Sequence, residues 1–416
     1  MSGKFLKNVG WMGGTEIVIR VSRLLVVVVL GRLLSPHDYG LAAIVLTVND
    51  FVDVLTRNGI TAKLIQAPQD DLPKLCNTAY WLTWIVAVLL FVIQCGAGVA
   101  AGWIYSDRAL ILPICTLALI YPMLPFAQVR SALIQRENRL EVSAVSVSLQ
   151  VVTNAVLTVI FAFLGWGMWA IVAPKVLVAP IWVVVNRVNH TWKAPRHFDL
   201  SGWQEIVQFG RSILGVEMLN TLRQNLDYLL VGPFLGVEQL GIYYFAFNAG
   251  LGLSLSAVNA LSQSLYPHLC ENPDQLPQRF MRALKAIACI IVPLVVLQAS
   301  LAPTYIPLVF GAKWTSAVPL AVLICLSAIP RPFARAASQV LWVRNRAHLD
   351  FLWECTFTVC FALAILAGLP WGLTGIATAV LAIHWIVLPL FTYGVIRYVV
   401  GSSFPPGLGR SSCIQC

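Results

Sequence analysis

The sequence predicts an all-α polytopic membrane protein with about twelve transmembrane helices, arranged as two parallel six-helix lobes around a central cavity. Three observations support this fold class. Hydrophobic residues occupy 58% of the 416 positions and charged residues only 11%, a balance typical of membrane proteins. Apolar runs of membrane-crossing length recur along the chain. Sequence patterns of the first half also return in the second half.

The expected spans are separated by polar residues or by glycine and proline. In the first half they lie at 9–33, 39–62, 78–103, 109–134, 141–164 and 167–187. In the second half they lie at 205–233, 240–266, 283–310, 315–342, 350–369 and 372–399. The first span follows two lysines and no cleavage site, so we expect it to remain uncleaved. Prolines interrupt the fourth and tenth spans, and the carbonyl groups that they free need partners in the protein or water.

The spans define the domain organisation. We expect an N-terminal lobe at 1–190, a cytoplasmic amphipathic connector at 191–204, a C-terminal lobe at 205–400 and a disordered tail at 401–416. The connector mixes aromatic and charged residues, as a segment at the lipid interface does. The tail is rich in Gly, Pro and Ser. No polar interval is long enough for a separate soluble domain.

Basic residues in the loops predict the orientation. With a cytoplasmic N-terminus, sixteen Lys and Arg residues fall on the cytoplasmic side, whereas the opposite side receives only Arg32, Arg108 and Lys313. This bias predicts that both termini are cytoplasmic, which requires an even number of spans. Because the basic residues flank apolar spans, we interpret the net charge of +10 as a topology signal and expect no nucleic-acid partner.

Three echoes relate the two halves. The segment 33–40 resembles 234–241, and each lies between two spans. The Pro-Phe-Ala at 125–127 and the Pro-Phe-Ala at 332–334 are each followed by Asn-Arg at the same distance. A Trp-Gly pair begins at 166 and again at 371. Because six spans separate the copies, the repeat is parallel, about an axis along the membrane normal.

The seventh span carries unusual charges for a membrane helix. Arg211, Glu217, Arg223 and Asp227 lie within it. A charge at the bilayer centre costs about 2.5–3.5 kcal/mol, so several on one helix predict a protein-lined or watery interior. Arg223 and Asp227 are four residues apart and share a helical face. They could therefore line a cavity, or form a buried ion pair that locks two helices together.

Further charges within the spans complete the candidate cavity lining. The cations are divided between the lobes, as binding of a phosphate-bearing substrate would require, and they are Arg20, Arg23, Arg130, Lys175, Arg223 and Arg335. The carboxylates are Glu16, Asp50, Asp53, Glu217 and Asp227. Because burial favours the neutral form of a carboxyl group, one of these could carry the proton of an ion-coupled cycle.

A purely structural interpretation competes at each of these positions. Glu16 could pair with Arg20, and Asp53 with Arg57, each within its own helix. Arg130, Arg331 and Arg335 could extend towards the cytoplasmic surface. Most cysteines are single residues within apolar spans, and we expect no metal site, cofactor or catalytic residue. The nucleotide-binding pattern G-x-x-x-x-G-K-[ST] is absent from the sequence, so direct use of ATP by this chain is not expected.

Several diffuse motifs resemble one known family. They are Leu33-Leu-Ser-Pro-His-Asp-Tyr-Gly40, Arg223-Gln-Asn-Leu-Asp227 with the following Leu235-Gly236 and Leu240-Gly-Ile-Tyr243, and Phe310-Gly-Ala-Lys-Trp314. In this order they resemble polysaccharide exporters of the Wzx type, in the lipopolysaccharide and colanic-acid branch of the multidrug/oligosaccharidyl-lipid/polysaccharide superfamily. The resemblance extends over nearly all of residues 1–400. Members of this branch often continue past twelve spans, so we expect a shortened C-terminus here.

The resemblance implies a flippase in the bacterial inner membrane. It would move an undecaprenyl-pyrophosphate-linked oligosaccharide or polysaccharide repeat unit across the bilayer by ion-coupled alternating access. Arg20, Arg23 and Arg223 would contact the pyrophosphate. The implied partners are the lipid-linked glycan, the bilayer, and the polysaccharide polymerase and chain-length machinery.

Two other functions compete with the flippase. One is an ion-coupled multidrug antiporter of the same superfamily, which would favour an acidic, aromatic cavity without clustered arginines. The other is a membrane-embedded polysaccharide polymerase or glycosyltransferase. Such an enzyme generally needs a substantial extracytoplasmic loop, and every expected loop on that side is short.

Overall fold

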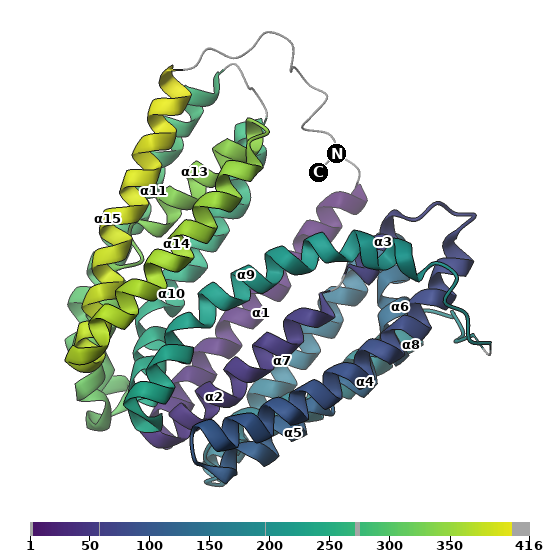
Figure 1. Ribbon diagram of the computed structural model, residues 1–416, viewed down its shortest axis with the longest axis horizontal. Helices are drawn as coiled ribbons and strands as arrows, with labels where there is room; N and C mark the ends of the chain where they lie inside the picture. The colour runs from purple at the N-terminus through teal and green to yellow at the C-terminus, as the bar shows by residue number, and fades with distance from the viewer. Residues whose placement is uncertain (1–2, 58, 196, 271–274, 402–416) are drawn as a thin grey trace. The chain divides into compact units, whose positions relative to one another are not determined.

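The computed structural model describes residues 3–401 except 58, 196 and 271–274, and these residues form helices and connections without a β-strand (Figure 1). The predicted tail lies outside the described residues beyond Gly401. The helices up to residue 241 are α1 (Gly3–Leu33), α2 (Pro36–Asp53), α3 (Ile60–Gln66), α4 (Leu72–Ile104), α5 (Ile111–Ala118), α6 (Leu124–Arg136), α7 (Leu140–Phe163), α8 (Trp169–Asn189) and α9 (Trp203–Leu235). The later helices are α10 (Val237–Cys270), α11 (Leu276–Tyr305), α12 (Val318–Leu326), α13 (Arg331–Val343), α14 (Ala347–Gly368) and α15 (Gly372–Gly401).

The helices confirm an all-α polytopic membrane protein. Eight segments of the described residues are long and apolar enough to cross a membrane, and one of them, Ala347–Val399, contains both α14 and α15. The long helices α1, α9 and α10 are not among these segments, and α1 and α9 carry several charged residues. When α14 and α15 are counted separately and these three helices are added, the described membrane-length helical segments number twelve, as the sequence predicts.

The chain divides into two compact units, Met1–Gly241 and Ile242–Cys416. In the first unit α7 packs along both α1 and α8, while α4 packs against α5 and α6. The helix α9 packs against α2, α3 and α4, so the contacts group it with the first unit, whereas the predicted boundary at 191–204 assigned it to the second lobe. The assignment of functional lobes stays a prediction.

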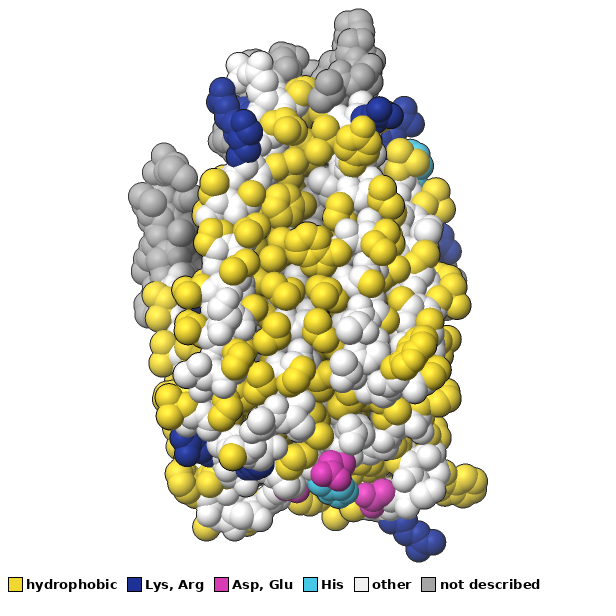
Figure 2. All heavy atoms as spheres, turned by 90° about the vertical axis from the view of Figure 1, so that its left-hand side faces the viewer, with side chains coloured by type: hydrophobic (Ala, Val, Ile, Leu, Met, Phe, Trp, Pro, Cys, Tyr) yellow, Lys and Arg dark blue, Asp and Glu magenta, His cyan; other side chains and the backbone are white. Residues whose placement is uncertain are grey.

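The second unit has its own core. In it α15 packs against α13 and α14, and α11 packs against α12. Phe245 stacks on Trp314 with ring centroids 3.7 Å apart, and Trp353 stacks on Phe391 at 4.1 Å. Figure 2 shows a broad hydrophobic face of the molecule, with charged side chains near its two ends. Such a face suits contact with lipid tails.

The repeat predicted from the sequence has a local structural counterpart in each unit. The fourth span breaks between α5 and α6, and the tenth breaks between α12 and α13. Asn138 and Asn345, which follow these paired helices, have positive φ angles of 56° and 55°. The backbone N–H groups of the next residues, Arg139 and Arg346, each donate to the carbonyl oxygen of the residue five positions earlier. Asparagine tolerates the left-handed backbone conformation better than most residues, so it is well suited to end a helix in this way.

Candidate functional site

Charged side chains of the first unit gather near the C-terminal end of α2, which packs against α8 and α9. Asp50 and Asp53 lie on the last turns of α2, and the Lys175 ammonium group on α8 is within electrostatic reach of both carboxylates. The side chain of Asn225 on α9 lies close to Asp50, and its Nδ2 atom donates to the Thr221 carbonyl at 3.1 Å. Three helices distant in sequence therefore contribute to one polar site.

Arg57 extends this site to a second part of α9. Its Nη1 atom donates to Glu217 Oε2 at 2.7 Å, and it is also within electrostatic reach of Asp50 and Asp53. The sequence suggested a local pair between Asp53 and Arg57, and the structure adds Glu217 as the hydrogen-bonded partner. We call Asp50, Asp53, Arg57, Lys175 and Glu217 the α2–α9 charge cluster.

The cluster has an uneven charge balance. It contains three carboxylates and two cationic groups, so one negative charge has no counterpart within it. Carboxylates close to one another disfavour full ionisation. The arrangement can therefore accept one further positive charge, either a proton on a carboxyl group or a monovalent cation beside it.

Tyr121 lies next to this cluster. It belongs to the short turn Tyr121–Met123 between α5 and α6, and only 2% of its surface is exposed. Its hydroxyl is buried and has no hydrogen-bond partner among the described residues, and the ring packs among apolar residues that include Val52 and Leu90. Asp50 and Asp53 are within electrostatic reach of the hydroxyl. Buried hydroxyl groups ordinarily have a partner, so this one could serve a transient ligand or water.

Sequence reasoning missed both Tyr121 and Asn225 as members of the site. A usable signal existed for each. Tyr121 immediately precedes Pro122 of the fourth span, where a helix break exposes polar groups. Asn225 lies between two predicted charged residues of the seventh span. Neither signal specifies which distant helix the side chain contacts.

The two predicted arginines of α1, Arg20 and Arg23, lie in different environments. Arg20 Nε lies 3.1 Å from Glu16 Oε1, so the local pair suggested by the sequence is present. Arg23, one turn further, is exposed and forms no ion pair with a described residue. Its role in binding an anionic substrate stays a prediction.

The remaining predicted cations lie elsewhere. On α9, Arg223 is half-buried and Asp227 is buried, with the backbone N–H of Tyr228 donating to Asp227 Oδ1 at 3.0 Å. Arg335 is exposed on α13 in the second unit. Arg130 donates to the backbone carbonyl of Trp192 at 3.0 Å and lies over the Trp192 ring, 5.5 Å from its centroid. It thus holds the connector, and a role in substrate binding stays a prediction for all three arginines.

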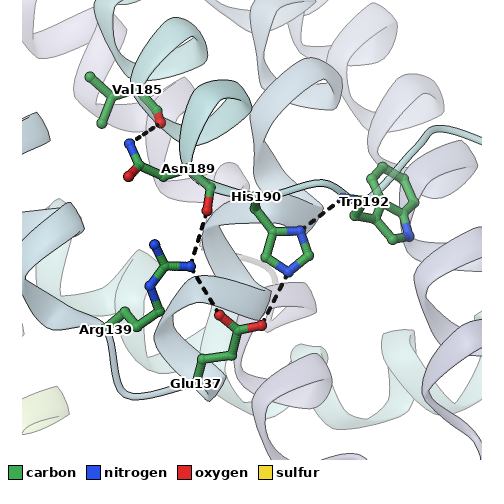
Figure 3. A network of polar contacts seen from close by, with 6 residues as sticks. All are labelled: Glu137, Arg139, Val185, Asn189, His190 and Trp192. Carbon is green, nitrogen blue, oxygen red and sulfur yellow. Dashed lines mark hydrogen bonds and ion pairs between the residues drawn. The ribbon is translucent and has the colours of Figure 1, made fainter.

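A polar network fastens the start of the connector to the first unit (Figure 3). Glu137 accepts from Arg139 Nη1 at 3.3 Å and lies 3.4 Å from His190 Nε2. Arg139 also donates to the Asn189 carbonyl at 3.0 Å. The backbone N–H of Trp192 donates to His190 Nδ1 at 3.0 Å, so this ring nitrogen acts as the acceptor. The end of α8 is therefore joined to the turn between α6 and α7.

Comparisons with known proteins agree with this architecture. The family model described as "Polysaccharide biosynthesis protein" matches residues 29–319. Teichuronic acid biosynthesis protein TuaB of Bacillus subtilis (strain 168) is 25% identical over 407 residues, covering 96% of this chain and 81% of that protein. Lipopolysaccharide biosynthesis protein WzxC of Escherichia coli (strain K12) is 24% identical over 415 residues, covering 96% of this chain and 82% of that protein.

Solved structures share the fold. The lipid II flippase MurJ in an inward closed conformation matches with a TM-score of 0.73 and 12% identity, covering 96% of this chain and 88% of that chain. An inward-facing multidrug resistance MATE family transporter matches with a TM-score of 0.63 and 15% identity, covering 97% of both chains. At these identities the likeness concerns the fold alone.

Proposed function

The chain belongs to the polysaccharide biosynthesis protein family, and from this premise we propose that it is a flippase for a lipid-linked oligosaccharide or polysaccharide repeat unit. The observation that carries the proposal is the presence of exposed cations and a charge cluster on membrane-length helices, where charge is energetically costly and marks a functional site. An undecaprenyl-pyrophosphate carrier is the proposed substrate class. We propose that the protein is located in the inner membrane of a bacterium, with both termini in the cytoplasm.

Cationic side chains would bind the pyrophosphate. Arg23 is the first candidate, because it is exposed on α1 without an ion-pair partner among the described residues. An arginine guanidinium can donate two parallel hydrogen bonds to the oxygens of one phosphate group. Lys175 supplies a second cation, an ammonium group that a bound phosphate would attract away from Asp50 and Asp53.

The competition for Lys175 would couple transport to an ion. While Lys175 stays within electrostatic reach of the carboxylates, the α2–α9 charge cluster carries one excess negative charge. When the ammonium group turns to a phosphate, that excess rises to two, and uptake of a proton or a monovalent cation becomes more favourable. Substrate binding and ion binding would then favour each other, as reciprocal linkage requires.

Transport in sealed vesicles tests the proposal. The purified protein is reconstituted with an undecaprenyl-pyrophosphate oligosaccharide, and its appearance in the opposite leaflet is followed for wild type, Arg23→Ala and Arg108→Ala. Arg108 is an exposed cation of the turn Arg108–Leu110 and serves as the matched control. We expect transport by wild type and the control, and a loss in Arg23→Ala.

One result would contradict the binding role of Arg23, and a second would contradict the flippase function. The first is equal transport by Arg23→Ala and wild type, which would remove Arg23 from the substrate site. The second is a failure of the wild type to move any of several glycan types, together with ion-driven efflux of a cationic drug from the same vesicles. That result would indicate the multidrug antiporter instead.

A further inference from the structure

Two arginines of the first unit lie near each other without an acidic partner. The Arg130 guanidinium on α6 and the Arg187 guanidinium on the last turn of α8 are within electrostatic reach of each other. No ion pair among the described residues includes either arginine. Glu137 and Asp199, the acidic residues of the adjoining turn and connector, bind other residues. Because like charges repel, an anion bound between the two arginines would be strongly favoured.

Both arginines keep N–H donors for such an anion. Arg130 uses Nε on the Trp192 carbonyl and Nη1 on the Phe126 carbonyl, and its guanidinium lies over the Trp192 ring. These contacts fix the orientation of the group, while its Nη2 atom donates to no described residue. The Arg187 side chain is exposed and donates to none of the described residues either. One guanidinium is therefore held in place, and the other can move to meet a ligand.

Arg187 lies towards the lipid-facing side of α8. Leu177, Val184 and Val188 are exposed apolar residues of this helix. Since successive helical residues are about 100° apart, these three lie on the side opposite Lys175, which is within electrostatic reach of the α2–α9 charge cluster. Arg187 follows Val184 by three residues, so the two are neighbours on one side of the helix. The arginine pair is thus separate from the charge cluster.

Aromatic side chains surround the arginine pair. The Tyr80 and Trp192 ring centroids are 5.9 Å apart, and the Tyr80 hydroxyl is within electrostatic reach of Arg130. Trp84 and Phe126 meet edge to face at 5.4 Å, and 43% of Phe126 is exposed. Tryptophan and tyrosine are enriched where lipid headgroups meet the hydrocarbon, and the sequence predicts that the connector lies there on the cytoplasmic side. These surroundings suit a lipid ligand better than a soluble one.

We propose that Arg130 and Arg187 bind the phosphate group of an anionic phospholipid of the cytoplasmic leaflet, such as phosphatidylglycerol. Its acyl chains would lie against Phe126 and the exposed apolar side of α8. Phosphatidylethanolamine would bind less well, because its ammonium group would be repelled by the two cations. Since Arg130 also binds the Trp192 carbonyl, an occupied site would stabilise the connector against the first unit. The inference does not rest on the proposed function, and it assigns Arg130 a lipid ligand in place of the substrate.

Photolabelling in bilayers tests the lipid site. The protein is reconstituted in phosphatidylethanolamine with a small fraction of phosphatidylglycerol that carries a photoreactive diazirine on an acyl chain. Labelled peptides are identified by mass spectrometry, and we expect them within 123–136 and 177–192. Excess unlabelled phosphatidylglycerol should remove this labelling. Glycerol 3-phosphate, which has the phosphate group without acyl chains, should leave it unchanged.

Variants of the exposed arginine give the sharpest comparison. Arg187→Ala should lower labelling of both peptides about fivefold, as expected for loss of one cation at a membrane surface, and Arg187→Lys should retain most of it. Arg108→Ala is the control, because Arg108 is an exposed arginine on the side predicted to be opposite the cytoplasm. It should match wild type. Unchanged elution on size exclusion establishes folding, and Arg187→Gln gives the same comparison if Arg187→Ala does not fold.

Three results would overturn the lipid site. One is equal labelling of Arg187→Ala and wild type. Another is competition by phosphatidylethanolamine or glycerol 3-phosphate that is as effective as competition by phosphatidylglycerol, which would indicate unselective lipid contact or a site for a free anion. The third is stronger competition by an undecaprenyl-pyrophosphate oligosaccharide at the same mole fraction, which would place the two arginines in the substrate path. Because none of these experiments measures transport, the lipid site and the flippase function succeed or fail separately.

Discussion

Arg57 and Glu217 form a 2.7 Å ion pair that joins the end of α2 to α9 across 160 residues of sequence. The pair connects the end of α2, which carries Asp50 and Asp53, to α9. About 58% of the Arg57 side chain and 31% of the Glu217 side chain are exposed, so water screens the interaction. The ion pair therefore contributes about 1 kcal/mol or less to the free energy of unfolding, as partly exposed pairs do.

Exchanging the charges of this pair should restore stability that each single change removes. We expect Arg57→Glu and Glu217→Arg each to lower the free energy of unfolding by up to about 1 kcal/mol, because each places like charges opposite one another. The double exchange should recover part of that loss, because the pair is restored while the carboxylate at position 57 now lies within reach of Asp50 and Asp53. Thermal or denaturant unfolding of the four proteins in one detergent gives the coupling energy directly. Strictly additive single effects would show that the two side chains do not interact in solution.

Two arginines one turn apart on α1 should differ in function. Arg20 is paired with Glu16, whereas Arg23 forms no ion pair with a described residue. We expect Arg23→Ala to reduce transport about tenfold or more, in line with loss of a charge-assisted hydrogen bond worth about 1.5–3 kcal/mol, and Arg20→Ala to reduce it less. Arg23→Lys should recover part of the activity, because the charge remains but the two-pronged geometry does not.

Initial flipping rates in vesicles, normalised to the amount of reconstituted protein, measure this difference. Glu16→Gln provides a matched control, because it frees Arg20 without removing a cation. Should Arg20→Ala reduce transport more than Arg23→Ala does, the paired arginine would be the ligand.

Sequence patterns predicted the fold well because hydrophobicity and helix breaks are local properties. The echo that ends at Asn138 and Asn345 corresponds to two left-handed residues with nearly equal φ angles. Contacts between helices are different, since apolar spans of similar composition can pack in many orders. No spacing within the chain relates Arg57 to Glu217, and the partners of Asp50 become visible only when α8 and α9 are placed beside α2.

The connector should loosen in acid because of one exposed carboxylate. The Ser201 backbone N–H donates to Asp199 Oδ1 at 2.8 Å and the Ser201 hydroxyl to Oδ2 at 3.1 Å; these two hydrogen bonds lower the pKa of Asp199 from its ordinary value of 3.8. A lowered folded-state pKa means that the stabilisation is present above the ordinary value. It is lost as the pH falls through the folded-state pKa.

Amide exchange across 198–202, corrected for the intrinsic pH dependence, measures this effect. We expect protection to be constant from pH 7 to about 5 and to fall below about pH 4. Asp199→Asn should show the same protection at every pH, because its amide cannot titrate. A pH-dependent loss of protection that persists in Asp199→Asn would assign the effect to another group.

Tyr121 should be dispensable for folding and required for ion coupling. Its hydroxyl is buried without a partner among the described residues, so Tyr121→Phe leaves no donor or acceptor unpaired, and we expect the free energy of unfolding to change by less than about 0.5 kcal/mol. If the hydroxyl contacts the ion taken up beside Asp50 and Asp53, the same change should weaken the response of transport to an imposed ion gradient. Flipping rates with and without a proton or sodium gradient measure that response.

Tyr80→Phe serves as a matched control, since Tyr80 packs against Trp81 and Trp192 near the connector. A gradient response that is equal in Tyr121→Phe and wild type would restrict Tyr121 to a packing role, and the ion would then be held by the carboxylates of α2 without it.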